Sequence, residues 1–253
     1  MMKQTGYIVV SGGARGLGRA VVDCFLELGH RVLVIDLNTQ PLDPLLKLYG
    51  DCLLAVQASV LDTDLLTDGL AQAKQLWGSV RGVVNCAGVA PAQRVIGRDG
   101  LMPLADFERA ISINLTGSFN LTRLAAHQMS EGEPDLEGQR GWVVLTASVA
   151  AYEGQKGQAA YAASKGGVAA LVLPLAREWA SMGIRVVGIA PGVFDTEMLA
   201  GLPEEATQSL AAAVPFPKRL GRASEYAQLV NQIAQNTYLN GTVLRLDAGL
   251  RMG

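Results

Sequence analysis

Short apolar runs rich in β-branched residues alternate with longer amphipathic stretches along the whole chain. Apolar runs bounded by turn residues are typical of buried strands, whereas apolar residues three and four apart are typical of helices. The predicted strands span Tyr7–Ser11, Arg31–Asp36, Cys52–Val56, Val80–Asn85, Val143–Ser148, Ile184–Ala190 and Thr242–Asp247. The predicted helices span Leu17–Leu28, Leu42–Tyr49, Asp62–Trp77, Pro103–Ala110, Asn114–Ser130, Gln158 to about Met182, and Ser224–Ala234.

This alternation predicts repeated β-α-β units, in which helices join parallel strands. We therefore expect an α/β fold, a doubly wound Rossmann domain with a seven-stranded parallel sheet and helices on both faces. No Pro/Ser linker and no change of composition interrupts the chain, so residues 1–253 are expected to form a single domain.

Three longer stretches lack a clear pattern: Ala90–Leu101, Glu131–Gly141, and Pro191 to about Pro217. The first and third follow the carboxyl ends of strands, where parallel sheets bind ligands, so both are expected to flank a pocket. The third also holds three apolar residues, Met198, Leu199 and Leu202. It could form a lid over an apolar substrate, or it could pack back on the domain.

Composition and charge exclude several classes of protein. The formal net charge is −2, which gives no basic surface for nucleic acid. We find no uncharged apolar run of about 18 residues and expect no membrane span. A strand follows the amino end almost at once, leaving no room for a targeting segment, so we expect a cytoplasmic protein. The three cysteines have no metal-binding spacing, and no metal site is predicted.

The first strand runs into a glycine-rich loop, Ser11–Gly18, that precedes a helix. Glycines there allow a tight turn and a close approach to a pyrophosphate, whose charge the helix amino terminus attracts. Asp36 ends the second strand, where a carboxylate accepts hydrogen bonds from ribose hydroxyls and repels a 2′-phosphate. This favours NAD over NADP. Arg15 leaves the cofactor preference open, because it could pair with a 2′-phosphate, pair with Asp36 or stay in solvent.

Tyr161 and Lys165 lie four residues apart in the Gln158 helix and so share one helix face. A tyrosine hydroxyl is a weak acid at neutral pH, but a neighbouring ammonium favours its phenolate and so lowers its pKa. Ser148 ends the preceding strand and could offer its hydroxyl to the same substrate oxygen. The three residues together predict acid-base chemistry at a carbon-oxygen bond.

The motifs together resemble the short-chain dehydrogenase/reductase family over the whole chain. They are Ser11-Gly-x-x-x-Gly-x-Gly18, Asn85-Cys-Ala-Gly88, Asn114, Ser148, Tyr161-x-x-x-Lys165, and Pro191-Gly192 with Thr196. The resemblance implies one dinucleotide-binding and catalytic domain, in which the catalytic residues are Asn114, Ser148, Tyr161 and Lys165. It implies that NAD is bound by Gly12, Arg15, Gly16, Leu17, Gly18, Asp36, Ser59, Val60, Asn85, Ala87, Gly88, Tyr161, Lys165, Pro191, Gly192, Val193 and Thr196.

The same resemblance gives individual roles. Asn114 would hold a water that relays protons to Lys165, and Thr196 would contact the nicotinamide amide. Two positions depart from the family pattern. Ser11 replaces the more usual threonine, and Ser59 stands where an aspartate commonly binds the adenine amino group. The second departure leaves adenine recognition open.

Further runs resemble the 3-hydroxyacyl-CoA dehydrogenases of this family. Among them are Glu153-Gly-Gln155, Val214-Pro-Phe-Pro217, Arg219-Leu-Gly221 and Arg245-Leu-Asp247. They imply NAD-dependent oxidation of acyl-CoA substrates, with steroids also in range. Gln155 and Gln158 could bond the substrate thioester carbonyl, or they could be solvent-facing loop amides.

Other functions stay open. The motifs also suit an NADPH-dependent 3-oxoacyl carrier-protein reductase, a steroid or sugar alcohol dehydrogenase, or a non-catalytic dinucleotide sensor. The apolar helices Asn114–Ser130 and Ala159–Ala180, with the family resemblance, predict a homotetramer.

Overall fold

A seven-stranded parallel sheet forms the centre of the protein in a computed structural model that describes residues 6–98, 100–197 and 204–252. The strand order is β11-β8-β7-β4-β1-β2-β3. Every predicted strand is found in this sheet, which confirms the predicted fold class. The strands are β1 (Tyr7–Ser11), β2 (Val32–Asp36), β3 (Leu53–Gln57), β4 (Val80–Asn85), β7 (Gly141–Thr146), β8 (Ile184–Pro191) and β11 (Val243–Leu246).

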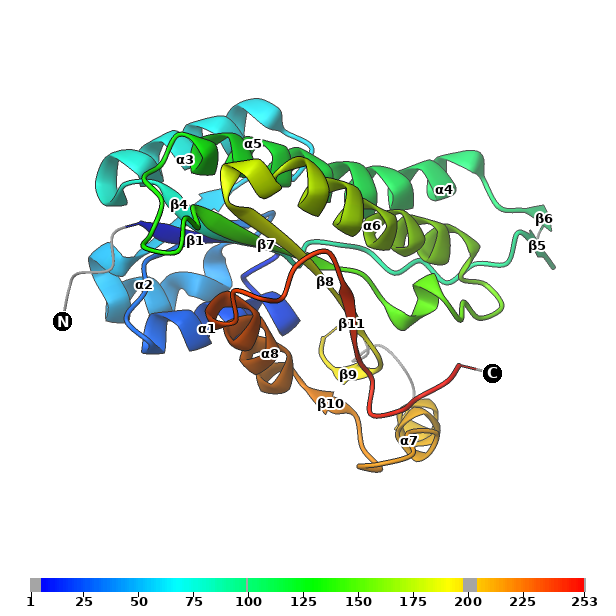
Figure 1. Cartoon of the computed structure of the whole chain (residues 1–253). Coiled ribbons are helices and arrows are strands. Elements are labelled where there is room, and N and C mark those ends of the chain that lie inside the picture. Colours follow the sequence, from blue (N-terminus) through cyan, green and yellow to red (C-terminus); the bar gives the residue numbers. More distant parts are fainter. Residues whose placement is uncertain (1–5, 99, 198–203, 253) are drawn as a thin grey trace.

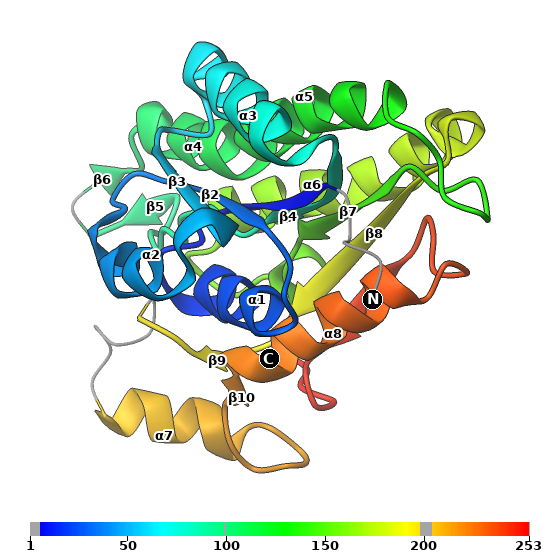
Figure 2. The same ribbon diagram turned by 90° about the vertical axis from the view of Figure 1, so that its left-hand side faces the viewer.

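Helices cover both faces of the sheet (Figures 1 and 2). They are α1 (Gly16–Glu27), α2 (Asp43–Tyr49), α3 (Thr63–Trp77), α4 (Leu104–Ile111), α5 (Ser118–Ser130), α6 (Ala159–Glu178), α7 (Glu204–Ala212) and α8 (Ala223–Gln235). Successive side chains of a strand point to opposite faces, so Val9 packs in the core beneath α3, α5 and α6, whereas Ile8 and Val10 pack in the core beneath α1, α2 and α8. Burial on both faces explains why these strands are continuously apolar.

The order of the strands reverses between β1 and β4, which are neighbours in the centre of the sheet. From β1 the chain proceeds outward to β2 and β3, and from β4 it proceeds the other way to β7, β8 and β11. In open parallel sheets ligands bind beyond the carboxyl ends of the strands at such a switch point. The glycine-rich loop after β1 and the Asn85–Gly88 motif after β4 therefore meet at one crevice.

The stretch predicted to be irregular from Pro191 to Pro217 contains a helix, α7, so that prediction was wrong for residues 204–212. The sequence carries a signal for it, since Glu204 and Glu205 occupy the first turn, where acidic side chains stabilise a helix amino terminus. Phe194–Asp195 (β9) also pairs with Gly221–Arg222 (β10). The lid residues Met198, Leu199 and Leu202 lie outside the described residues.

Two smaller differences concern predicted loops and strand ends. The Ala90–Leu101 stretch contains a short antiparallel pair, Ile96–Gly97 (β5) with Gly100–Leu101 (β6). The strand predicted to end at Ser148 ends at Thr146, because pairing with β8 stops there. Ser148 keeps an extended backbone and begins the 3₁₀ helix Val149–Ala151.

Helix α6 is long and apolar enough to cross a membrane by length and composition, and it is the one such helix among the residues that the structure describes. Its inner face is buried, with Val168, Val172 and Leu175 in the core that covers the sheet. A core helix of a globular domain has the same composition, so this feature is weak evidence for a membrane span.

Candidate active site

The glycine-rich loop is shaped by close backbone contacts. Gly12 has a φ of 65°, which side chains rarely adopt, and a Cβ atom there would lie 2.7 Å from the backbone nitrogen of Ala87. A Cβ atom on Gly18 would collide with the carbonyl oxygen of Gly12. Gly16 has a φ of 55°, and its Cβ position lies 3.7 Å from the side chain of Thr196. The loop therefore brings the first and last predicted cofactor motifs together.

Helix α1 begins at this loop without a side-chain cap, because its N-cap residue, Arg15, makes no capping hydrogen bond. Its first backbone N–H groups are thus available to an anion. Leu17 packs against the core and anchors the start of the helix. The Arg15 side chain forms an exposed ion pair with Glu197 at 3.1 Å rather than with Asp36. Of the three alternatives for Arg15, pairing with Asp36 is therefore not found.

Asp36 holds the edge of the crevice at the end of β2. Its Oδ2 atom accepts a hydrogen bond from the Ala14 backbone N–H at 3.0 Å, and Oδ1 accepts one from Asn38 at 3.1 Å. Each oxygen of a carboxylate can accept two hydrogen bonds, so capacity for two ribose hydroxyls remains. The uncapped helix, the glycine contacts and this carboxylate fit the pyrophosphate and adenosine ribose of a dinucleotide.

Ser59 and Val60 follow β3, beside the end of β2. The Ser59 hydroxyl accepts a hydrogen bond from the Leu61 N–H at 3.2 Å, which shapes the turn before α3. Val60 is buried, and its carbonyl oxygen accepts a hydrogen bond from Asn120 at 3.0 Å. Both residues lie just after the end of β3, and their contact with adenine stays a prediction.

The Asn85–Gly88 motif forms the floor of the crevice. Asn85 donates from Nδ2 to Thr122 at 2.8 Å, while its buried Oδ1 atom has no partner among the described residues. The Ala87 backbone N–H donates to the Ser11 hydroxyl at 3.3 Å, which joins the ends of β4 and β1. This contact needs only a hydroxyl, so the serine at position 11 can make it as a threonine would.

Lys165 lies buried at the centre of the site. Its Nζ atom donates a hydrogen bond to the Thr146 carbonyl oxygen at 2.7 Å and lies 5.9 Å from the centre of the Tyr161 ring. Gly88 lies beside the same atom, since a Cβ atom there would be 3.7 Å from Nζ. The helix face predicted from the spacing of Tyr161 and Lys165 is therefore turned toward Gly88, at the crevice.

Burial governs the acidity of this pair. It raises the pKa of Tyr161, and a hydrogen bond with Ser148 partly opposes the rise. Burial also lowers the pKa of Lys165 to about 8. The net direction for Tyr161 is therefore upward, and the lowering of its pKa by Lys165 stays a prediction. Removing water disfavours both charged forms, so proximity alone does not create a phenolate.

Asn114 connects the crevice to α6. Its Oδ1 atom accepts from the Val89 N–H at 2.8 Å, and its Nδ2 atom donates to the Val89 carbonyl at 2.8 Å and to Ser164 at 2.9 Å. It lies in a π-helical turn, Ser112–Gly117, between α4 and α5. Such turns are rare and often occur at functional sites.

The Pro191–Thr196 stretch borders the crevice on the other side. Pro191 ends β8 beside Leu246 of β11, and the Gly192 N–H donates to the Leu246 carbonyl at 2.9 Å. The Val193 carbonyl accepts from Gly221 at 2.9 Å. A side chain on Gly192 would press on Asp247, since its Cβ would lie 2.9 Å from the Asp247 Cα atom. Glycine is therefore required there by packing.

The two predicted substrate glutamines differ in their contacts. Gln158 uses its side-chain oxygen to accept the Gln155 backbone N–H at 2.9 Å, which shapes their own loop. Gln155 is exposed. The same loop is joined to the Ala90–Leu101 stretch, because the Gln93 N–H donates to the Gly157 carbonyl at 2.8 Å. A hollow of about 460 Å³ lies beside this stretch, lined by residues 89–93 and by Asp106, Arg109 and Ala110. The hollow contains none of the predicted cofactor or catalytic residues, so the expectation that this stretch flanks the ligand crevice stays a prediction.

Two polar residues beneath the site were not singled out by the sequence analysis. Thr146 accepts the Lys165 hydrogen bond, and its hydroxyl lies 2.6 Å from the Tyr226 hydroxyl. Ser164 links Asn114 to the Tyr161 carbonyl, to which it donates at 2.7 Å. The signal for Ser164 was its place inside the Tyr161-x-x-x-Lys165 motif. Thr146 had only its position two residues before Ser148.

Comparison with known proteins agrees with this geometry. The model of the short chain dehydrogenase family matches residues 6–207. The chain is 46% identical over 247 residues to 3-hydroxyacyl-CoA dehydrogenase type-2 of Homo sapiens, covering 96% of this chain and 94% of that protein. It is 32% identical to a 3-oxoacyl-[acyl-carrier-protein] reductase of Thermotoga maritima, covering 96% of each. A crystal structure of 3-hydroxyacyl-CoA dehydrogenase type-2 from Mycobacterium avium superposes with a TM-score of 0.93 at 38% identity, covering 100% of this chain and 99% of that one. The chain belongs to the short-chain dehydrogenase family and is an oxidoreductase.

Proposed function

We propose that this oxidoreductase interconverts 3-hydroxyacyl-CoA and 3-oxoacyl-CoA with NAD. The observation that carries the proposal is 46% identity, over almost the full length of both chains, to a dehydrogenase named for that substrate. Identity to the carrier-protein reductase is 32%, which favours the CoA ester over the carrier-protein thioester.

The side chains then have the following roles. NAD, when bound, would supply the hydride acceptor. In the oxidative direction Tyr161 removes the proton from the substrate hydroxyl, and Ser148 donates a hydrogen bond to the same oxygen. Lys165 lies beside Tyr161 and provides the positive charge that stabilises the phenolate once it forms. Asn114 holds the π-helical turn against Val89 and Ser164, and so fixes the back of the site.

The preference for NAD rests on Asp36. Its carboxylate is held by two backbone N–H groups at the place where the ribose of a dinucleotide would bind. A 2′-phosphate there would meet like charge. Arg15 is paired with Glu197, so its charge is partly compensated. The ribose and phosphate contacts would come from Asp36 and the glycine-rich loop, and the adenine contacts from Ser59 and Val60.

A turnover panel tests the proposal. The purified protein is assayed with 3-hydroxyacyl-CoA esters, hydroxysteroids and sugar alcohols, each with NAD and NADP. We expect kcat/KM to be highest for a 3-hydroxyacyl-CoA ester with NAD. Activity confined to alcohols without CoA would contradict the substrate, and greater efficiency with NADP would contradict the cofactor. Dinucleotide binding without any turnover would support a sensor.

The homotetramer and the cytoplasmic location stay predictions from the sequence. The outer side of α5 and α6 supports assembly, because Phe119 and Leu173 are exposed there. Ala163 and Ala170 lie exposed on α6 as well, so the outer side of this helix carries several exposed apolar residues. Self-association would remove such side chains from water.

A further inference from the structure

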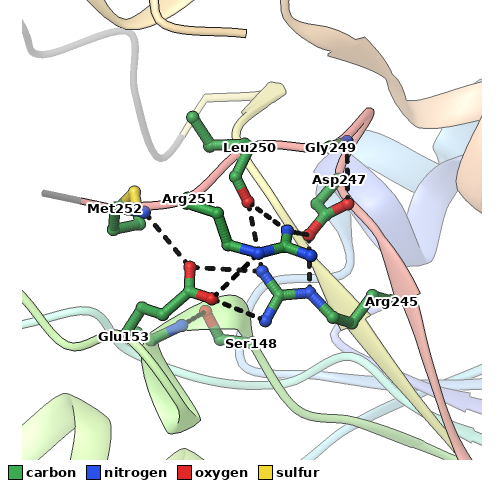
Figure 3. Close-up of polar contacts among 9 residues, drawn as sticks. Ser148, Glu153, Arg245, Asp247, Gly249, Leu250, Arg251 and Met252 are labelled. Atoms are coloured by element: carbon green, nitrogen blue, oxygen red, sulfur yellow. Dashed lines mark hydrogen bonds and ion pairs between the residues drawn. The ribbon is translucent and has the colours of Figure 1, made fainter. Parts of the chain in front are cut away.

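An ion-pair network lies next to the Ser148 turn and takes no part in the chemistry described above (Figure 3). Glu153 is five residues after Ser148, and its backbone N–H donates to the Val149 carbonyl at 3.0 Å, so it closes the same turn. The Arg245 guanidinium binds the Glu153 carboxylate with two nitrogens, at 2.9 and 3.2 Å. Arg251 lies 3.4 Å from the same carboxylate, and the Met252 backbone N–H donates to it at 3.1 Å.

The partners of Glu153 all belong to β11 or to the segment that follows it, Asp247–Met252, here called the closing segment. Hydrogen bonds described for the closing segment otherwise remain local. Gly249 donates to Asp247 at 3.0 Å, Leu250 donates to the Asp247 carbonyl at 2.9 Å, and Arg245 donates to the Leu250 carbonyl at 3.1 Å. Glu153 therefore provides the polar link between this segment and the rest of the described protein.

The closing segment is held in a conformation that a free chain would avoid. Ala248 has a φ of 51° and is the one non-glycine residue with positive φ in the described part of the chain. Such a backbone persists only where its surroundings fix it. Leu250 is buried with 2% of its surface exposed, although it belongs to neither of the two cores that cover the sheet.

The closing segment contacts three other parts of the chain. Asp247, at its start, packs against Gly192, which borders the crevice. Gly249 lies against the Val214–Pro217 stretch, since a Cβ atom there would be 3.6 Å from the Pro215 side chain. The third contact is Glu153, on the Ser148 turn. The segment thus touches three stretches: Gly192 in the predicted cofactor motif, the Val214–Pro217 stretch, and the turn that begins at Ser148.

The charges and the burial of the network suit it to fixing the position of the closing segment. Its two acidic and two basic side chains alternate, so their formal charges cancel. Arg245 is only 25% exposed, Glu153 22% and Asp247 8%, so solvent screens them incompletely. A bidentate arginine–carboxylate pair also fixes the relative orientation of the two side chains, which a single lysine contact does not.

We propose that Glu153 is a specificity-determining positioning residue, whose carboxylate fixes the closing segment as one wall of the substrate site. The inference rests on the proposed function for the identity of the substrate. It requires no contact between Glu153 and the reacting atoms. Loss of the carboxylate should weaken binding of an extended substrate while leaving proton and hydride transfer nearly intact.

The test is a double-mutant cycle that compares Glu153→Gln, deletion of residues 251–253, and the two changes combined. Glutamine keeps the shape of the side chain but places an N–H group or a neutral oxygen against the arginines. We expect each change to raise KM for the 3-hydroxyacyl-CoA ester about tenfold, with kcat within about twofold, as for an interaction that binds ground state and transition state equally. If Glu153 acts through the closing segment, the double variant should show no further rise, whereas independent effects would multiply to about a hundredfold.

Three controls make the result specific. Glu131→Gln removes a more exposed ion pair, with Lys74 of α3 at 2.8 Å, that shares no residue with the network, and should leave KM unchanged. The Kd for NADH, followed by its fluorescence, should be the same in all variants. Arg245→Lys keeps the charge but has one ammonium in place of the two-pronged group, and we expect a KM rise of about threefold. This milder variant carries the test if Glu153→Gln does not fold.

The inference is overturned by a KM equal to that of the Glu131→Gln control, by multiplicative effects in the double variant, or by a fall in kcat at unchanged KM. A changed Kd for NADH also overturns it, because the network would then act on the cofactor side through Gly192. Failure of the proposed function would look different. Wild-type protein would then prefer another class of alcohol, and the same cycle would be measured with that alcohol.

Discussion

Replacing Tyr161 with phenylalanine removes one hydroxyl group and keeps the ring. In the structure this hydroxyl is buried and interacts with Ser148, whose own Oγ atom accepts the Ala150 N–H at 3.1 Å. The ring would still fill its space beside Lys165. Loss of one such hydrogen bond changes the free energy of unfolding by about 1 kcal/mol, so the variant should remain folded. The expected loss is therefore almost entirely one of chemistry.

The magnitude follows from the role of the hydroxyl. A positioned acid-base group contributes roughly 10²–10⁴ in rate, or about 3–5.5 kcal/mol of the activation free energy. The pH dependence has a definite sign. Burial raises the pKa of Tyr161, so the phenol predominates at neutral pH and the phenolate fraction grows with pH. For the wild type, kcat/KM for oxidation should rise with pH, whereas the Tyr161→Phe variant should lose this dependence with the activity.

Steady-state oxidation measured from pH 6 to 10, with a single-turnover measurement of NADH formation, provides the assay. The matched control is Tyr152→Phe, because Tyr152 is an exposed tyrosine between Ser148 and α6, with its ring 5.8 Å from the Arg245 guanidinium carbon. The control should keep wild-type rates, and both variants should bind NADH normally. A Tyr161→Phe enzyme with near-normal turnover, or with an unchanged pH profile at reduced rate, would refute the assignment.

The other predictions concern the cofactor, the buried lysine and the assembly. Asp36→Ala should lower the ratio of kcat/KM for NAD to that for NADP by about a hundredfold, and an unchanged ratio would contradict the role of Asp36. The pKa of Lys165 is about 8 in the folded protein, against 10.5 in the unfolded chain. Burying the charged lysine therefore reduces the free energy of unfolding by about 3 kcal/mol below pH 8, and this cost disappears as pH rises toward 10.5. The Lys165→Met variant loses this cost but also loses the hydrogen bond to Thr146, so urea unfolding at pH 7 should show it to be more stable than wild type by about 2 kcal/mol. The difference in stability should shrink toward pH 10. A difference that does not change with pH would argue against this account. Light scattering should give four times the chain mass of 26.7 kDa, and introducing charge by Phe119→Asp and Leu173→Asp should lower it.

The sheet could be predicted from the sequence because its signals are local. The inner strands are short, mostly apolar runs that are buried on both faces, and helices such as α1, α3 and α8 each show an apolar stripe. The helix α7 was missed although Glu204 and Glu205 favour a helix start. Its segment lies among prolines and glycines that pointed to a loop, and short helices of this kind depend on the packing of the loop around them.

The site was predictable at the level of motifs and not at the level of partners. Local spacing puts Tyr161 and Lys165 on one face, and motif order brings Ser11 and Asn85 to the same end of the sheet. No local sequence pattern predicts that Arg15 pairs with Glu197, 182 positions away, or that Glu153 pairs with Arg245, 92 positions away. Such pairs depend on how the loops fold across the ends of the strands, which a single sequence does not encode in any periodicity.

The acidity of Tyr161 shows why proximity and environment must be treated separately. The spacing of Tyr161 and Lys165 correctly predicts a cation beside a phenol, and by Coulomb attraction that cation favours the phenolate. The fold then buries both groups, which disfavours the phenolate and the ammonium alike. Burial lowers the pKa of Lys165 into the neutral range, so the attraction on which the phenolate depends weakens as pH rises through about 8. The same change in pH supplies the base that oxidation needs. The two effects oppose each other, and for that reason the rise of oxidation rate with pH should be shallower than that of an isolated phenol.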